Sequence, residues 1–354
     1  MAKTSVGFGI VGVGMIAEFH AQAIHAIDGA HLVASYSRSQ PSVTEFAQRH
    51  GGGACTDISE FLARRDLDIV AICTPSGAHL EPCLAAAAAG KHVICEKPLE
   101  VTTARVDAMI AACDAAGVML AGIFPRRFNP STTHLKQAID QGRFGQIALV
   151  EASVKWWRTQ AYYDSGDWRG TWALDGGGAL MNQGIHTIDL LLHLMGDVKS
   201  VRAETKLVAH AGIEVEDTAV AMLEFKSGAL GVIQGSTACW SATGHPAEIH
   251  IMGSGGSAIM TDDRFRVWEF RDAISEDNAI REINITQDGG AGAGAADPGA
   301  IDFKWHQRNF EDALAALQKN KPPRVNGVEA RRAVALIGAI YESAAKSGCK
   351  VEVH

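Results

Sequence analysis

An apolar run that ends in a glycine-rich turn places the strongest constraint on how this chain folds. Residues Val6–Val11 indicate a buried strand, and Gly12-Val13-Gly14-Met15-Ile16-Ala17 fits G-x-G-x-x-[GA] at the start of a helical stretch, Met15–Ile27. The first glycine allows a tight turn, the second lets a pyrophosphate approach the backbone, and the helix N-terminus offers unpaired N–H groups. We therefore predict a dinucleotide cradle formed by Gly12, Gly14, Met15 and Ile16. The alternative is a glycine-rich turn that binds no dinucleotide.

The first 120 residues alternate between strand-like and helix-like patterns with short connections. Further strands are expected at Leu32–Tyr36, Ile69–Cys73, Val93–Cys95 and Val118–Phe124, and helices at His79–Ala89 and Thr102–Ala116. This βαβα rhythm is typical of a parallel, doubly wound sheet, because a crossover between parallel strands usually contains a helix. We predict a dinucleotide-binding Rossmann domain over residues 1–124.

From about residue 125 the pattern changes to strands with few helices between them. Helices are expected at 131–141, 179–195, 302–319 and 327–346, and strands at 146–155, 198–209, 215–226, 229–238, 246–252, 257–261, 265–270 and 280–286. Clustered strands favour a large, open, mostly antiparallel sheet, so residues 125–354 are predicted to form an α+β domain within an overall α/β protein. The glycine-rich residues 288–300 are predicted to form a flexible loop.

Charge and cysteine usage exclude several classes of protein. The 354 residues include 32 basic and 40 acidic side chains, a net charge of −8, so the overall field repels nucleic acid and anionic membranes. No uncharged apolar stretch reaches the roughly 18 residues of a membrane span. The seven cysteines include no C-x-x-C pair, which favours reduced core residues in a cytoplasmic protein. We expect neither nucleic-acid nor membrane partners.

The end of the second predicted strand bears on which dinucleotide is bound. An NAD-preferring site usually has Asp or Glu here, to accept hydrogen bonds from the ribose 2′-OH, but no acidic residue lies between residues 31 and 44. Ser37 and Arg38 are suited instead to a 2′-phosphate, since a guanidinium matches phosphate geometry. We expect NADP to be favoured over NAD. The alternative is that Arg38 stacks on the adenine or faces solvent.

Three further motifs follow the cradle in a specific order. They are Thr74-Pro75-Ser76-Gly77-Ala78-His79 (T-P-x-x-x-H), Glu96-Lys97-Pro98, and residues 176–189, which fit G-G-G-x-L-x-x-x-G-x-H-x-x-D. With these motifs, nearly the whole chain resembles the Gfo/Idh/MocA oxidoreductases. The resemblance implies NAD(P)-dependent chemistry on sugars, cyclitols and their derivatives. It also implies a second domain that binds substrate and whose exposed sheet face makes a homodimer or homotetramer.

The same resemblance assigns roles to residues in these motifs. It implies that Glu96 and Lys97 border the nicotinamide and the substrate, and that the peptide bond before Pro98 is cis. The cofactor contacts that it implies are Thr74, Pro75, His79, Glu96 and Lys97. Lys97 comes at the carboxyl end of a predicted parallel strand, where ligand crevices form in open α/β sheets. The alternative for Lys97 is a surface lysine whose stem packs on apolar neighbours.

Polar residues of the third motif are spaced to share one helix face. Asn182, His186, Asp189 and His193 follow one another at intervals of four, three and four residues. Oxidising a secondary alcohol requires removal of the hydroxyl proton, and a neutral imidazole suits this task near pH 7. We predict His186 as general acid/base, with Lys97 hindering its protonation and stabilising the developing alkoxide. The alternatives are a structural core histidine and a metal ligand, but no metal-binding motif supports a metal site.

Asn182 departs from the pattern of many family members, which carry Asp one turn before the histidine. An amide cannot take up a proton, so Asn182 can only orient groups by hydrogen bonding. The variant M-N-Q-x-I-H resembles the subgroup that contains UDP-N-acetylglucosaminuronic acid 3-dehydrogenases. That likeness implies a nucleotide-sugar or other uronic-type substrate.

Residues 156–172, WWRTQAYYDSGDWRGTW, combine aromatic rings with arginines. Flat aromatic faces suit pyranose rings, and guanidinium groups suit carboxylates or phosphates. We expect the following substrate contacts: Arg127, Arg158, Tyr163, Trp168, Arg169, Asn182 and His186. The alternative is an aromatic core or an oligomer contact.

Together these features predict an NAD(P)-dependent oxidoreductase acting on a secondary alcohol of a sugar, sugar acid, nucleotide sugar or cyclitol. One alternative is a regulatory protein that senses the dinucleotide without turnover, although such a protein needs no proton-transfer groups. The other is a hydrolase or epimerase that uses tightly bound NAD transiently.

Overall fold

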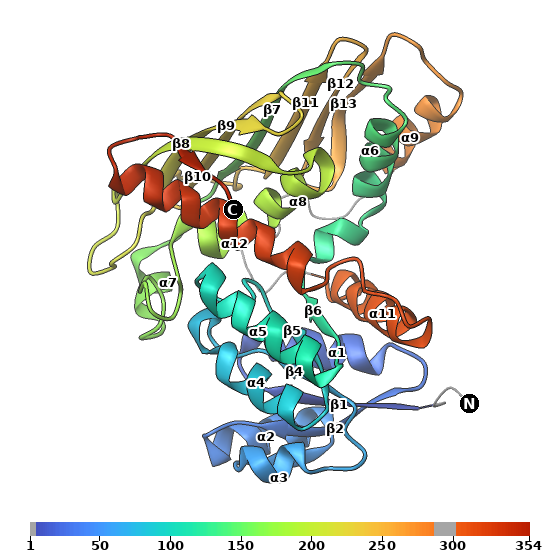
Figure 1. Cartoon of the computed structure of the whole chain (residues 1–354), viewed down its shortest axis with the longest axis vertical. Coiled ribbons are helices and arrows are strands. Elements are labelled where there is room, and N and C mark those ends of the chain that lie inside the picture. The colour runs from blue at the N-terminus through green and yellow to red at the C-terminus, as the bar shows by residue number, and fades with distance from the viewer. Residues whose placement is uncertain (1–4, 287–301) are drawn as a thin grey trace. The chain divides into compact units, whose positions relative to one another are not determined.

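The computed structural model describes residues 5–286 and 302–354, and the chain forms two compact units. One unit contains Met1–Pro125 and Asp302–Val334, and the other contains Arg126–Ile301 and Ala335–His354 (Figure 1). The predicted boundary after residue 124 lies beside the observed one. However, residues 302–334 pack with the first unit, whereas the sequence assigned them to the second. The glycine-rich residues 288–300 lie outside the described residues.

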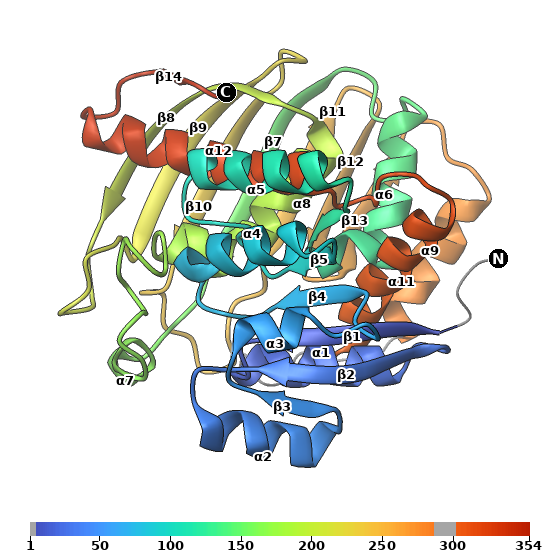
Figure 2. The same ribbon diagram turned by 60° about the horizontal axis from the view of Figure 1, so that its bottom comes forward.

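The first unit is built on a six-stranded parallel sheet with the order β3-β2-β1-β4-β5-β6. The strands are β1 (Val6–Val11), β2 (Ala30–Tyr36), β3 (Gly53–Cys55), β4 (Ile69–Ile72), β5 (His92–Cys95) and β6 (Leu120–Gly122). Figure 2 shows β3, β2, β1 and β4 following one another from one edge of the sheet. The order reverses between β1 and β4, as in a doubly wound Rossmann sheet, so the predicted fold of this part is confirmed.

Helices cover both faces of this sheet, because its central strands are buried on both sides. They are α1 (Met15–His25), α2 (Gln40–His50), α3 (Ile58–Leu62), α4 (Leu80–Ala88), α5 (Thr103–Ala116), α11 (Lys304–Gln318) and the first part of α12 (Gly327–Ala345). Helix α11 buries Phe310 and Ala313 in the same core as Phe8 of β1, with the two phenylalanine rings 5.8 Å apart. This burial is the physical reason that residues 302–334 join the first unit.

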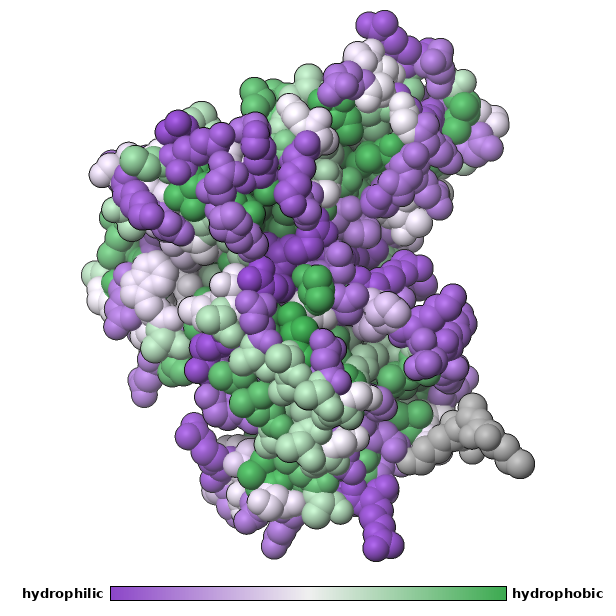
Figure 3. Space-filling model, viewed as in Figure 1, coloured by the Kyte–Doolittle hydropathy of each residue, from purple (hydrophilic) through white to green (hydrophobic). Residues whose placement is uncertain are grey.

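Helices α4 and α5 pack together on the face of the sheet opposite α1 (Figures 1 and 2). Between them the Sγ atoms of Cys83 and Cys113 lie 3.8 Å apart. All seven cysteines carry free thiols, and four of them are buried. The outer surface of α4 and α5 is rich in alanine and appears pale green in Figure 3. This surface is therefore only mildly apolar.

The second unit is built on an eight-stranded sheet with the order β13-β12-β11-β7-β10-β9-β8-β14. Its strands are β7 (Ile147–Lys155), β8 (Val198–Lys206), β9 (Thr218–Phe225), β10 (Leu230–Ser236), β11 (Glu248–Gly253), β12 (Gly256–Thr261), β13 (Arg264–Phe270) and β14 (Val351–Glu352). Only β7 and β10 pair in parallel, and the other neighbours pair antiparallel. The predicted open, mostly antiparallel sheet is therefore confirmed.

One face of this sheet is covered by helices and the other carries exposed apolar side chains. The helical segments are η2 (Pro125–Phe128), α6 (Pro130–Asp140), α7 (Gln160–Asp164), the π-helical turn η3 (Ala179–Gly184), α8 (Ile185–Met195) and α9 (Glu276–Thr286), with the last part of α12. Gly235 lets η3 approach β10 closely, because a Cβ there would lie 2.4 Å from Leu180. On the other face Leu149, Met222 and Leu230 are each more than half exposed.

The predicted strand at 280–286 is wrong, because these residues form the second half of helix α9. Glu276 and Asp277 stand in the first turn of this helix, where acidic groups interact favourably with the helix dipole. Asp277 also accepts the backbone N–H of Ile274 at 2.9 Å. These contacts at the helix start outweigh the modest strand preference of the isoleucines.

Within residues 5–286 and 302–354, no helix combines the length and the apolar character needed to cross a bilayer.

Candidate functional site

The turn between β1 and α1 has the backbone that the predicted phosphate cradle requires. Gly12 has φ +87°, and a Cβ there would lie 2.9 Å from the backbone of Cys73, so only glycine fits. Gly14 faces open space, with no atom outside its chain neighbours within 4 Å of a Cβ position. No side chain caps α1 among the described residues, which leaves the N–H groups of its first turn for a phosphate. Met15 is 52% exposed and Ile16 is half-buried. This turn therefore fits a dinucleotide pyrophosphate.

The loop after β2 presents Arg38 to solvent. Ser37 is half-buried, and its Oγ accepts the backbone N–H of Ser39 at 3.2 Å. Ser39 in turn caps the N-terminus of α2. The loop thus combines an exposed guanidinium with hydroxyls and a helix start, a combination that suits a phosphate group.

The turn after β4 is fixed by His79, which is buried although we expected it to contact the cofactor. The Nδ1 atom of His79 lies 2.9 Å from the carbonyl oxygen of Pro98, and Nε2 lies 2.8 Å from that of Thr74. The imidazole therefore joins the turn after β4 to the turn after β5. The hydroxyl of Thr74 donates to the carbonyl of Ala78 at 2.9 Å, and Pro75 begins the next turn half-buried.

Glu96 and Lys97 directly follow β5, at the sheet edge where the carboxyl ends of β1, β2 and β4 also lie. The Lys97–Pro98 peptide bond is cis, as the resemblance implies. Lys97 is half-buried, and its backbone N–H donates to Oε2 of Glu96 at 3.1 Å. The motif residues of this unit therefore gather at one edge of the parallel sheet.

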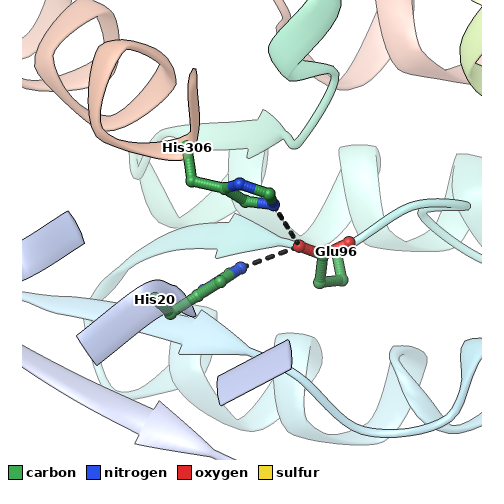
Figure 4. Close-up of side chains that lie close together, drawn as sticks. All are labelled: His20, Glu96 and His306. Atoms are coloured by element: carbon green, nitrogen blue, oxygen red, sulfur yellow. Dashed lines mark hydrogen bonds and ion pairs between the residues drawn. The ribbon is translucent and has the colours of Figure 1, made fainter. Parts of the chain in front are cut away.

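The carboxylate of Glu96 lies between two buried imidazoles, from α1 and α11 (Figure 4). Its Oε1 atom lies 2.8 Å from Nε2 of His20 and 3.7 Å from Nε2 of His306. The Nδ1 atom of His20 lies 3.2 Å from Sγ of Cys73. The sequence did not predict this group, because its members are far apart along the chain and each fits an ordinary helix or strand pattern.

Asn182 and His186 lie where the π-helical turn η3 passes into α8. A π turn contains more residues than an α turn and occurs often at functional sites, so the predicted stripe is interrupted near Asn182. The amide of Asn182 donates to Oδ1 of Asp175 at 2.6 Å, which fixes its orientation. Asp175 is 2% exposed and also accepts the backbone N–H of Gly170 at 2.9 Å. The sequence did not identify Asp175 as a partner of this helix.

The start of η3 is held by the buried carboxylate of Glu216. It accepts the backbone N–H groups of Gly178 at 2.8 Å and Leu180 at 2.9 Å, and the hydroxyl of Tyr341 at 3.1 Å. A Cβ on Gly178 would lie 1.7 Å from the Glu216 carbonyl oxygen, so the glycine is required by this close approach. Burial raises the pKa of Glu216 to about 7, although the hydrogen bonds act in the opposite direction.

Two residues expected to bind substrate are instead engaged inside the second unit. Arg127 donates to both carboxylate oxygens of Asp189 at 2.8 and 2.7 Å, and both side chains are buried. The hydroxyl of Tyr163 lies 2.8 Å from Oγ1 of Thr237, and Tyr163 is 4% exposed. Both contacts are those of a structural core, because a buried ion pair is costly to break and a buried hydroxyl needs its partner.

Within residues 156–172, the arginine side chains contact Tyr162 and not the neighbouring Tyr163 that we expected to bind substrate. Its hydroxyl accepts a hydrogen bond from Arg169 at 2.7 Å and another from Gln183 at 3.0 Å. The Arg169 guanidinium also lies over the rings of Tyr162 and Trp168, 4.3 and 4.5 Å from their centroids. Arg158 lies 5.5 Å from the Tyr162 ring on the same segment. Both guanidinium groups thereby contact the Tyr162 ring, and the hydroxyl of Tyr162 is joined by Gln183 to the turn that bears Asn182.

The doubly wound sheet and its phosphate cradle define a dinucleotide-binding protein with a second, sheet-based unit. Residues 6–124 match the family model of the oxidoreductase family, NAD-binding Rossmann fold, and residues 132–259 match the GFO/IDH/MocA C-terminal domain. The chain is 32% identical to myo-inositol 2-dehydrogenase of Thermotoga maritima over 253 residues, 70% of this chain and 73% of the relative. It belongs to the Gfo/Idh/MocA family of NAD(P)-dependent oxidoreductases.

Two further relatives match almost the whole chain. Inositol 2-dehydrogenase of Rhizobium meliloti is 27% identical over 354 residues, 97% of this chain and 98% of the relative. The crystal structure of the WlbA dehydrogenase from Bordetella pertussis in complex with NADH and UDP-GlcNAcA has a TM-score of 0.91 and 33% identity, covering 100% of this chain and 99% of that one. The predicted family and the predicted enzyme class, a dehydrogenase acting on CH–OH groups, are confirmed.

Proposed function

We propose that this chain oxidises a secondary alcohol of a nucleotide-linked sugar acid, within the wider sugar and inositol chemistry of its family. The observation that carries the proposal is the full-length match, at 33% identity, to a dehydrogenase whose structure contains NADH and UDP-GlcNAcA. The M-N-Q-x-I-H motif supports the same substrate class, because it resembles the subgroup that contains UDP-N-acetylglucosaminuronic acid 3-dehydrogenases.

His186 is the proposed general acid/base, and Lys97 is its proposed electrostatic partner. A neutral imidazole accepts the hydroxyl proton, and an ammonium group favours the neutral imidazole and stabilises an alkoxide. Asn182 is proposed to orient the substrate, because its amide is already fixed by Asp175. Gly12, Gly14 and the first turn of α1 would hold the pyrophosphate of NAD(P). The bound nicotinamide supplies the hydride acceptor.

The anionic part of the substrate is proposed to contact Arg169, which is half-buried, whereas Arg158 is only 6% exposed and is proposed to act through its charge. Both guanidinium groups are ordered by aromatic rings before any ligand binds, which lowers the entropy lost on binding. Trp168, which is half-buried, offers an aromatic face to the same ligand. A carboxylate or a diphosphate would satisfy the two positive charges.

NADP is proposed as the preferred cofactor, on the chemistry of Ser37 and Arg38. The exposed guanidinium of Arg38 and the start of α2 support a 2′-phosphate site. The WlbA relative was crystallised with NADH, which makes a direct comparison necessary. If the proposal is correct, Arg38→Ala weakens NADP binding by about tenfold and NAD binding much less. Equal losses for the two cofactors contradict an Arg38 contact with the 2′-phosphate.

The exposed sheet face, defined by Leu149, Val220, Met222 and Leu230, is the proposed surface for a homodimer or homotetramer. These side chains are 49% to 60% exposed on three neighbouring strands, and Leu230 pairs directly with Leu149 across β10 and β7. A contiguous apolar face of this kind is typical of a protein–protein interface.

The proposal is tested with a panel containing UDP-GlcNAcA, myo-inositol and levoglucosan, each with NAD and with NADP. Formation of reduced cofactor with a sugar supports it. A sensor binds cofactor but reduces none of it with any member of the panel. An enzyme that uses NAD transiently retains cofactor through purification and converts substrate without net reduction. These two outcomes favour the two alternatives over the proposal.

A further inference from the structure

The buried group around Glu96 is the strongest feature that the proposed chemistry leaves unused. Its members are the three residues drawn in Figure 4, namely Glu96 after β5, His20 on α1 and His306 on α11. Cys73, which follows β4, also belongs to the group, and all four residues lie in the first unit. We infer that this group holds a permanent negative charge on Glu96, which makes the site bind the oxidised, cationic nicotinamide more tightly than the reduced, neutral one. The inference rests on the proposed function, because it presupposes an NAD(P) site at this sheet edge.

The hydrogen bonds of the group form a chain in which Cys73 donates to His20 and His20 donates to Glu96. Burial raises the pKa of the Cys73 thiol well above its usual range, so the thiol stays protonated and its S–H points to Nδ1 of His20 at 3.2 Å. Burial likewise lowers the pKa of His20, which keeps the imidazole neutral. With Nδ1 accepting, the proton of His20 is on Nε2 and is donated to Glu96 at 2.8 Å.

Glu96 therefore carries a negative charge beside the neutral side chains of His20 and Cys73. Burial by itself would raise its pKa, but the interactions with His20 and His306 hold the pKa well below its usual range. The other carboxylate oxygen accepts the backbone N–H of Lys97 at 3.1 Å. The thiol of the buried Cys95, which precedes Glu96 in the chain, has a pKa raised well above its usual range by burial and by Glu96, so it adds no charge.

The position of Glu96 indicates which part of a dinucleotide its charge affects. In a doubly wound sheet the dinucleotide crosses the carboxyl edge, with its adenosine half over the strands that follow the glycine cradle on one side of the reversal. The nicotinamide half then lies over the other side, where β4, β5 and β6 end. Glu96 is the residue that follows β5, the middle strand of these three. A buried charge there is weakly screened and acts over several ångströms.

A metal site is the other reading of these residues. One ligand atom from each of His20, Glu96 and His306 falls within 4.8 Å of the others. However, the His20–Glu96 contact is already an ordinary hydrogen bond at 2.8 Å. The Nδ1 atom of His306 has no hydrogen-bond partner among the described residues, whereas a metal-bound imidazole almost always donates its second N–H. The hydrogen-bonded arrangement is therefore favoured.

The test compares the dissociation constants of oxidised and reduced cofactor in wild type and in Glu96→Gln, which removes the charge but keeps the shape. We expect the ratio of the oxidised to the reduced constant to rise about tenfold or more, because one unit charge within about 12 Å at an effective dielectric of about 20 has at least that effect. Glu96→Asp keeps the charge and should keep most of the preference. Glu60→Gln, on an exposed part of α3, makes the same charge change and should leave the ratio unaltered.

Three results overturn the inference. The first is an unchanged ratio in Glu96→Gln while wild type binds both cofactors, and this result leaves the proposed function intact. The second is stoichiometric Zn²⁺ binding by the wild type that is lost in Glu96→Gln, which establishes a metal site. The third is failure of the wild type to bind either cofactor, which removes the proposed function as well. If Glu96→Gln does not fold, His20→Ala carries the test, because loss of the imidazole donor should raise the same ratio by a smaller factor.

Discussion

The amide of Asn182 donates to the buried carboxylate of Asp175 at 2.6 Å. A hydrogen-bond donor at position 182 therefore satisfies a buried acceptor just before the helix that bears His186. In Asn182→Asp two carboxylates would face each other there, and the pKa of the pair would rise. At low pH a shared proton preserves the geometry, and at high pH repulsion displaces the new side chain. We expect the activity of the variant relative to wild type to fall as pH rises, in a pH–rate profile.

Asn182→Ala is the control for this prediction, because it removes the amide without adding a charge. Its loss of activity should be the same at every pH. If the ratio of Asn182→Asp activity to wild-type activity does not change with pH, Asp175 does not influence this position.

Arg169 is predicted to act on the anionic part of the substrate. Arg169→Gln should raise KM for UDP-GlcNAcA about tenfold and change kcat by less than about threefold, since the interaction is made equally in ground and transition states. KM for the neutral myo-inositol should change less. Arg202→Gln, an exposed change on β8, is the matched control. An equal change of KM for both substrates argues against an anion site.

Glu216 makes the stability of the second unit depend on pH. Its folded-state pKa of about 7 lies above the ordinary value of 4.5, so the folded protein favours the protonated acid. The stabilisation is present at low pH and is lost as pH rises from about 5 to about 7, by roughly 3 kcal/mol if no other group compensates. Glu216→Gln cannot ionise, so its unfolding free energy in urea should decline less than that of wild type over this range. Parallel pH dependences in the two proteins would exclude Glu216 as the cause.

The exposed sheet face is predicted to hold subunits together. Met222 is 60% exposed, and Met222→Asp places a charge among apolar neighbours, so light scattering after size-exclusion chromatography should report a smaller assembly. Val328→Asp, at an equally exposed site on α12, is the control and should keep the wild-type mass. The same mass for Met222→Asp and wild type would place any interface elsewhere.

Much of the fold could be predicted because local patterns and tertiary structure agree. Gly12 has a positive φ and lies close to a neighbouring backbone, and both conditions favour glycine. The glycine pattern in the sequence therefore predicts the backbone geometry of the turn. The alternation of strands and helices predicted the parallel sheet, because a crossover between parallel strands usually contains a helix. Helix α2, strand β3 and helix α3 were not predicted, although Asp57 caps α3 in an ordinary way. Strand β3 and helix α3 are too brief for hydrophobic periodicity to identify, and the 11-residue α2 buries only Val43 and Phe46, so its apolar face is narrow.

The site was less predictable, because side-chain partners are set by tertiary contacts. Glu216 and Gly178, or Glu96 and His306, are distant in sequence, and a single chain carries no signal for such pairs. Tyr162 and Tyr163 are adjacent aromatics, and only the local backbone decides that Tyr163 is buried. Arg127, like Arg169, is next to an aromatic residue in the sequence, yet its guanidinium forms a buried ion pair with Asp189. Residue type alone therefore indicates the chemistry but not the partner.

The most direct test of the central claim follows the near-ultraviolet absorbance of reduced cofactor with UDP-GlcNAcA in wild type and in His186→Ala. We predict that wild type forms reduced cofactor. We also predict that turnover of the variant falls by about 100-fold or more, while its cofactor dissociation constant stays within about twofold. Equal turnover in the two proteins, or no reduction by wild type with any sugar or cyclitol of the panel, would contradict the account.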